Sequence, residues 1–131
     1  MRVLVAEDND VSQLLAKRLL ERLGCAVDTA RTGLEAIELW RQHPYQLILM
    51  DCQMPELDGY EATKRIRIHQ NGGPRVPVIA LTAHASAADH ERCIQAGMDD
   101  YIAKPVSLKS LSETLVRWMP LNLEASAGQG S

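Results

Sequence analysis

The chain has 131 residues, which is the size of one compact domain. Hydrophobic residues make up 46% of it and charged residues 24%, and no apolar run approaches the about 20 residues that cross a bilayer, so we expect no direct membrane contact. The formal net charge of -3 also gives no attraction for nucleic acid. The first residues turn acidic and lack the cleavage site of a signal peptide, which predicts a cytoplasmic location.

Five short runs rich in Val, Ile and Leu alternate with longer segments of helical period, the pattern of βαβ units. The predicted strands are residues 2–6, 26–30, 46–50, 78–81 and 101–103. The second run alternates in polarity, which predicts an edge strand. Right-handed crossovers place helices on both faces, so the expected fold class is α/β, with a doubly wound parallel sheet of five strands.

Capping residues predict where the helices begin. The pairs with suitable spacing are Asp10 with Gln13, Thr32 with Glu35, Asp58 with Glu61 and Ser86 with Asp89, and Ser107 can cap the last helix. The expected buried stripes are Val11, Leu15 and Leu19 in the first helix, and Leu111, Leu115 and Trp118 in the last. Residues 1–120 then form the domain, and residues 121–131, rich in Ala, Gly and Ser, form a flexible tail.

Polar residues stand at the carboxyl ends of the predicted strands, where doubly wound sheets bind ligands. They are Glu7 and Asp8 after the first strand, Asp51 after the third, Thr82 after the fourth and Lys104 after the fifth. Each acid alone is better explained as a helix cap or a solvated loop residue. Three converging carboxylates, however, repel one another unless a cation lies between them, and Mg²⁺ prefers such oxygen ligands. Their convergence therefore favours a magnesium site.

Thr82 and Lys104 suggest what this site binds, because a hydroxyl and an ammonium group can hold the oxygens of a phosphoryl group. Asp51 would then be the nucleophile. An ionised carboxylate needs no partner base, and phosphoryl transfer mainly requires positioning and neutralisation of charge.

Four segments of the sequence resemble the response-regulator receiver domain. They are Val3-Leu4-Val5-Ala6-Glu7-Asp8-Asn9, Met50-Asp51-Cys52-Gln53-Met54-Pro55-Glu56-Leu57-Asp58-Gly59, Ala80-Leu81-Thr82-Ala83, and Gly97-Met98-Asp99-Asp100-Tyr101-Ile102-Ala103-Lys104-Pro105. The resemblance implies a flavodoxin-like (βα)5 fold with strand order 2-1-3-4-5.

The same resemblance implies the roles of the site residues. Glu7 and Asp8 would serve Mg²⁺, or Mn²⁺ in its place, together with Asp51 and the backbone carbonyl of Gln53. Asp51 would be the phosphoacceptor. Thr82 and Lys104 would bind the phosphoryl group, Tyr101 would be the switch aromatic, Gln53 and His84 would tune the phosphoryl lifetime, and the bond between Lys104 and Pro105 would be cis.

The implied function is phosphoryl transfer from a phosphohistidine to Asp51 in a two-component phosphorelay, followed by slow self-dephosphorylation. The implied partner is a histidine kinase or a histidine phosphotransfer domain. The segment Asp-Cys-Gln-Met-Pro at residues 51–55 is most similar to receivers of hybrid sensor kinases. This resemblance implies that the chain is a fragment of a hybrid kinase, namely the cytoplasmic part of a membrane-bound one. Whether the chain counts as an enzyme stays open, since it would catalyse only its own phosphorylation and dephosphorylation.

Three alternatives belong to other functional classes. Asp8-Asn9-Asp10 matches the Asp-x-Asp nucleophile of phosphatases that resemble haloacid dehalogenases, although the chain is short for them and the other motifs fall outside their order. A flavodoxin-like electron carrier would need a hydroxyl- and glycine-rich loop where this chain is acidic. An interaction module that is never phosphorylated is the third alternative, and the complete site argues against it.

Overall fold

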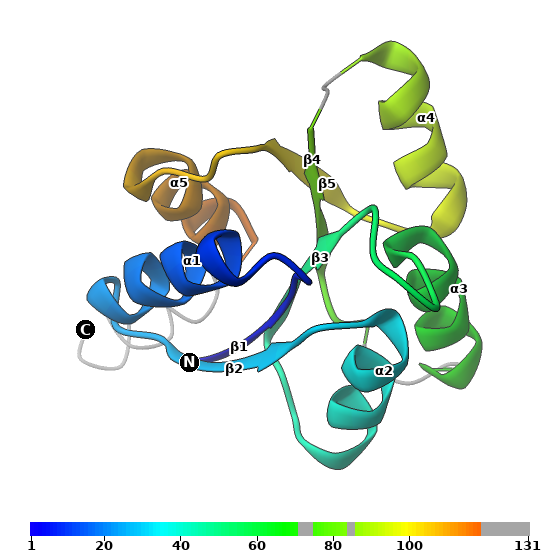
Figure 1. Cartoon of the computed structure of the whole chain (residues 1–131), viewed down its shortest axis with the longest axis horizontal. Coiled ribbons are helices and arrows are strands. Elements are labelled where there is room, and N and C mark those ends of the chain that lie inside the picture. The colour runs from blue at the N-terminus through cyan, green and yellow to red at the C-terminus, as the bar shows by residue number, and fades with distance from the viewer. Residues whose placement is uncertain (71–74, 84–85, 119–131) are drawn as a thin grey trace, which may run out of the picture.

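The computed structural model describes residues 1–70, 75–83 and 86–118 (Figure 1). In chain order the elements are β1 Arg2–Ala6, α1 Asp10–Arg22, β2 Ala26–Ala30, α2 Gly33–Gln42, β3 Leu47–Asp51, α3 Gly59–Gln70, β4 Val78–Thr82, α4 Ala87–Ala96, β5 Asp100–Ala103 and α5 Leu108–Trp118. All strand pairs are parallel, in the order β2-β1-β3-β4-β5. This confirms the predicted fold class and the edge position of β2. The predicted tail and His84 lie outside the described residues.

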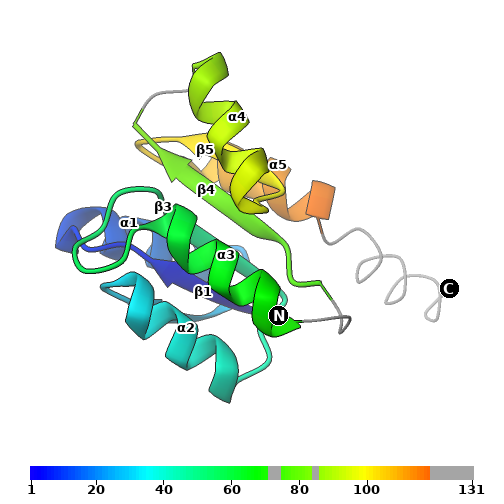
Figure 2. The ribbon, with the colours of Figure 1, turned by 90° about the vertical axis from the view of Figure 1, so that its right-hand side faces the viewer.

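Helices cover both faces of the sheet. Figure 1 shows α1 and α5 on one face, and Figure 2 shows α2, α3 and α4 side by side over the other. Successive residues of a strand point to opposite faces. In β1, Val3 and Val5 therefore pack in the core beneath α1 and α5, whereas Leu4 and Ala6 pack beneath the other three helices. Burying each large side chain of these cores contributes about 1.5–3 kcal/mol.

Two strands extend further toward the carboxyl edge of the sheet than predicted. β3 includes Asp51 and β4 includes Thr82, because backbone pairing continues to those residues. Asp51 pairs with Leu81, and Thr82 pairs with Ala103. Two of the predicted site residues are thus held in place by the hydrogen bonds of the sheet and do not lie in loops.

The first helix is capped one residue earlier than predicted. Asn9 is its N-cap and accepts a hydrogen bond of 2.9 Å from the backbone N–H of Ser12. Asp10 is the first helical residue instead, and its carboxylate pairs with Arg31. Gln13 makes no capping box, because its amide donates to the carbonyl oxygens of Glu7 and Ala30 at 2.9 and 3.2 Å. The other predicted caps are confirmed: Thr32, Asp58, Ser86 and Ser107 each accept a backbone N–H three residues later.

The predicted buried stripe of α1 is wrong. Val11 is 78% exposed and Leu15 is 38% exposed, while Ala16 and Leu20 are buried. Leu19 is only partly buried. Apolar residues occur all around this helix, so their periodicity does not show which face meets the sheet. Packing against β2 and α5 determines that face. In α5 the prediction is confirmed for Leu111 and Leu115, and Trp118 packs partly buried against the same core.

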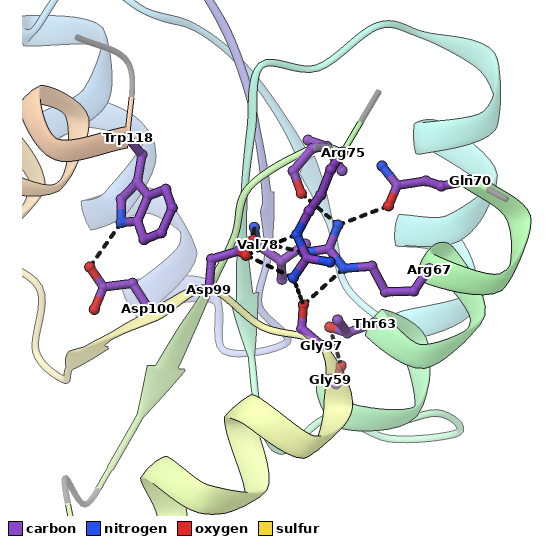
Figure 3. Close-up of polar contacts among 11 residues, drawn as sticks. Gly59, Thr63, Arg67, Gln70, Arg75, Val78, Gly97, Asp99, Asp100 and Trp118 are labelled. Atoms are coloured by element: carbon purple, nitrogen blue, oxygen red, sulfur yellow. Dashed lines mark hydrogen bonds and ion pairs between the residues drawn. The ribbon is translucent and has the colours of Figure 1, made fainter. Parts of the chain in front are cut away.

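A polar network joins α3 to the turn between α4 and β5 (Figure 3). Arg67 donates from Nε to the carbonyl oxygen of Gly97 at 2.8 Å and from Nη2 to Asp99 at 2.7 Å. Asp99 also accepts from Arg75 at 2.8 Å and from the backbone N–H of Val78 at 2.9 Å. Gly97 has a φ of +98°, which glycine adopts without strain. The network therefore fastens the amino ends of β4 and β5, at the edge of the sheet away from Asp51.

Candidate functional site

Three carboxylates meet at the carboxyl edge of the sheet. Asp51 ends β3 and is 3% exposed, Glu7 follows β1 and is 1% exposed, and Asp8 is the most exposed of the three. One oxygen from each lies within 4.8 Å of the others. Gly59 permits the close return of the chain beside Asp51, because a Cβ there would lie 2.1 Å from the carbonyl oxygen of Asp51. The structure thus brings together all three acids singled out from the sequence.

Lys104 reaches this group from the residue after β5. Its Nζ lies 3.0 Å from Oε1 of Glu7 and 3.1 Å from Oδ1 of Asp51. Burial by itself would lower the pKa of Lys104, but hydrogen bonds and charge interactions with Glu7 and Asp51 outweigh it, so the pKa is raised. The ammonium group is therefore charged at neutral pH. The bond between Lys104 and Pro105 is cis, as predicted.

The pKa of Glu7 lies above its ordinary value. Burial raises the pKa of Glu7, and the neighbouring Asp51 raises it further, while the backbone N–H of Asn9 and the Lys104 ammonium lower it in part. Oε1 of Glu7 is buried, and among the described residues the cation beside it is the Lys104 ammonium, which Glu7 shares with Asp51. A buried carboxylate that shares one ammonium group with a second carboxylate, beside a third, suits a divalent cation that binds through oxygen.

The structure also places the other predicted residues, which are Thr82, Gln53 and Tyr101. Thr82 is buried at the end of β4, and it lines a hollow together with Asp51 and Lys104. The backbone N–H of Gln53 donates to Oδ1 of Asp51 at 3.2 Å. Tyr101 lies apart from them: it is half-buried in β5, lines a hollow against α5, and meets the ring of His90 edge-on at 5.0 Å.

Asp51 lies between two hollows. The acidic hollow has a volume of about 780 Å³ and is lined by Glu7, Asp8, Asp10 and their neighbours. The second, here called the α4-side hollow, has a volume of about 360 Å³ and is bounded by the loop after β3, by α3 and by α4. Its walls include Tyr60 and Arg92, which sequence analysis did not single out. No local motif marks either residue, because only the packing of α3 against α4 brings them to Asp51.

Comparison with known proteins identifies the family. The chain matches the model of the response regulator receiver domain over residues 3–116. It belongs to this family. This confirms the resemblance drawn from the four sequence segments and sets aside the phosphatase and electron-carrier alternatives. The chain is a receiver domain of two-component signalling.

Curated relatives are much longer proteins. The chain is 39% identical over 128 residues to the sensor protein GacS of Pseudomonas syringae, covering 96% of this chain and 14% of that protein. It is 43% identical over 117 residues to the hybrid signal transduction protein dokA of Dictyostelium discoideum, covering 89% of this chain and 7% of that protein. The chain thus corresponds to a small part of each relative.

Solved structures show the same fold. The receiver domain of a sensor histidine kinase from Pseudomonas aeruginosa, solved with a magnesium ion in its active-site cleft, is 46% identical with a TM-score of 0.81, covering 89% of this chain and 95% of that one. The receiver domain of Ssk1 from Saccharomyces cerevisiae, crystallised with the histidine phosphotransfer protein Ypd1, is 34% identical with a TM-score of 0.87, covering 93% and 90%.

Proposed function

We propose that Asp51 accepts a phosphoryl group from a phosphohistidine in a Mg²⁺-dependent reaction. The observation that carries this proposal is the position of the Lys104 ammonium, 3.0 Å from Glu7 and 3.1 Å from Asp51, at the edge where three carboxylates converge. Family membership supports the same reaction.

The acidic group fits Mg²⁺. Glu7, Asp8 and Asp51 offer carboxylate oxygens within 4.8 Å of one another, and the backbone carbonyl of Gln53 would complete the protein's share of ligands. When bound, the ion neutralises charge on the phosphoryl oxygens. The magnesium ion in the related Pseudomonas aeruginosa receiver domain supports this assignment. Mn²⁺ prefers the same oxygen ligands.

Each remaining site residue has its own role in the phosphoryl transfer. The Asp51 carboxylate, held by its strand and by the N–H of Gln53, attacks phosphorus while the histidine nitrogen leaves. Lys104 binds one phosphoryl oxygen with its charged ammonium group, and the Thr82 hydroxyl binds another. Gln53 also borders both hollows, where it can govern the access of water to the phosphoryl group.

The wider setting follows from the relatives. Because they include sensor and hybrid kinases of which the chain spans a small part, we infer that it works inside a hybrid kinase or beside one. The complex of a related receiver with a phosphotransfer protein supports a histidine phosphotransfer domain as the partner. The described helices include none that is long and apolar enough to cross a membrane. A cytoplasmic location remains part of this proposal.

Phosphorylation with a small donor tests the proposal. The protein is incubated with phosphoramidate and Mg²⁺, and the mass of the intact chain is measured. We expect one phosphoryl group in the wild type and none in Asp51→Asn, because the amide lacks the nucleophilic charge. Glu61→Gln, on the exposed side of α3, is the matched control for loss of a carboxylate and should be phosphorylated normally.

Two results would count against the proposal. Phosphate that stays on Asp51→Asn would place the nucleophile elsewhere. A folded wild type that takes up no phosphate, from phosphoramidate or from a phosphorylated histidine phosphotransfer domain, would favour an interaction module that works without phosphorylation.

A further inference from the structure

Arg92 brings a positive charge into the α4-side hollow, next to the proposed phosphoacceptor. This exposed residue of α4 lines the hollow together with Asp51, Thr82 and Lys104. Its Cζ lies 4.2 Å from the centroid of the Tyr60 ring, a cation-π contact with a side chain that is buried in α3. The ring covers one face of the guanidinium and leaves the N–H donors at its edge available to an anion.

The acidic side chains of this hollow have other partners. Asp58 accepts the backbone N–H of Glu61 at 2.9 Å, and Asp89 accepts the hydroxyl of Ser86 at 3.0 Å, so both serve the starts of helices. Asp51 is paired with Lys104. Within residues 1–70, 75–83 and 86–118, no carboxylate lies at ion-pair distance from Arg92. Arg92 is therefore an exposed cation that lines the hollow, packs on the Tyr60 ring and forms no ion pair within the described residues.

We propose that Arg92 makes the site selective for small acyl phosphates as phosphoryl donors, by binding the carboxylate that leaves. The proposal rests on the proposed role of Asp51. In the reaction an Asp51 carboxylate oxygen forms a bond to phosphorus while the bond between phosphorus and the acyl oxygen breaks. The acyl oxygen keeps the electron pair and departs as a carboxylate, and no proton moves.

The chemistry of the leaving group explains the selectivity. In the loose transition state of phosphoryl transfer, negative charge builds up on the leaving oxygen of an acyl phosphate. The Arg92 guanidinium, on the wall of the same hollow, stabilises that charge. Phosphoramidate instead releases ammonia, which carries no negative charge and gains nothing from Arg92. A volume of about 360 Å³ gives a small acyl group room beside the phosphoryl group.

The test compares the two donors on the same protein. Rate constants for phosphorylation by acetyl phosphate and by phosphoramidate, both with Mg²⁺, are measured for the wild type, Arg92→Gln, Arg92→Lys and Arg65→Gln. We expect the ratio of acetyl phosphate to phosphoramidate rates to fall about fivefold in Arg92→Gln, which equals about 1 kcal/mol. Arg92→Lys should keep most of the ratio. Arg65, exposed on α3 outside the hollow, is the matched control, and its loss should leave the ratio unchanged.

Ionic strength provides a second readout, which a merely structural role of Arg92 would not move. Added salt should lower the ratio in the wild type, because it screens an exposed charge, and should have little effect in Arg92→Gln.

An equal fall of both rates in Arg92→Gln, or a ratio no lower than in Arg65→Gln, would overturn the proposal while leaving Asp51 as the phosphoacceptor. Failure of the wild type to accept phosphate from either donor would overturn both.

Discussion

Replacing Arg67 by Met should destabilise the protein far more than replacing Arg75 by Met, although both arginines pair with Asp99. The Arg67 side chain is 13% exposed and Asp99 is 12% exposed, whereas Arg75 is 55% exposed. Breaking a buried ion pair costs about 3–5 kcal/mol, because the remaining charge loses its partner. Asp99 would keep Arg75 and the Val78 N–H, so we expect the lower end, about 3 kcal/mol. For the exposed Arg75 we expect less than about 1 kcal/mol.

Urea unfolding followed by far-ultraviolet circular dichroism measures this difference. The midpoint should fall strongly for Arg67→Met and slightly for Arg75→Met, with similar slopes for both. The double variant should lose more than the sum, since Asp99 then has no cation beside it. Equal losses for the two single variants would refute the argument, because they would show that burial of this pair does not determine its contribution.

Three further predictions concern other parts of the molecule. Asn9→Ala should lower the free energy of unfolding by about 1 kcal/mol in the same urea assay, because it removes the N-cap of α1; no change would mean that another group caps this helix. Burial would raise the pKa of Asp100, but hydrogen bonds from Trp118, the Tyr101 N–H and Arg117 outweigh it and lower the pKa below its ordinary value of 3.8. The ionised Asp100 therefore stabilises the fold fully above about pH 3.8, and this contribution is lost as the pH falls through the lower pKa of the folded state. In Asp100→Asn, stability measured by thermal unfolding should therefore depend less on pH at the acid end. Beryllofluoride, which mimics the phosphoryl group, should change the ring NMR signals of Tyr101 in the wild type but not in Thr82→Ala, and identical signals in all samples with the mimic bound would rule out their coupling.

Local sequence determined the elements of this protein and the edge of the sheet that carries the site. Runs of β-branched and aliphatic residues specify strands, and Thr32, Asp58, Ser86 and Ser107 cap helices through bonds to residues three positions away. Such signals act over a few residues, so they can be read without the fold. Parallel pairing then brings strand ends together, which is why Glu7, Asp8 and Asp51 could be expected to meet.

Tertiary packing alone decided which neighbours these elements have. The apolar residues around α1 fit more than one orientation, and contact with β2 and α5 buries Ala16 and Leu20 rather than Leu15. The contact between Arg92 and Tyr60 joins two different helices, and the pairing of Arg67 with Asp99 joins α3 to the turn before β5. No short-range sequence pattern encodes such pairs, because the distance between the two side chains depends on how whole helices pack against the sheet.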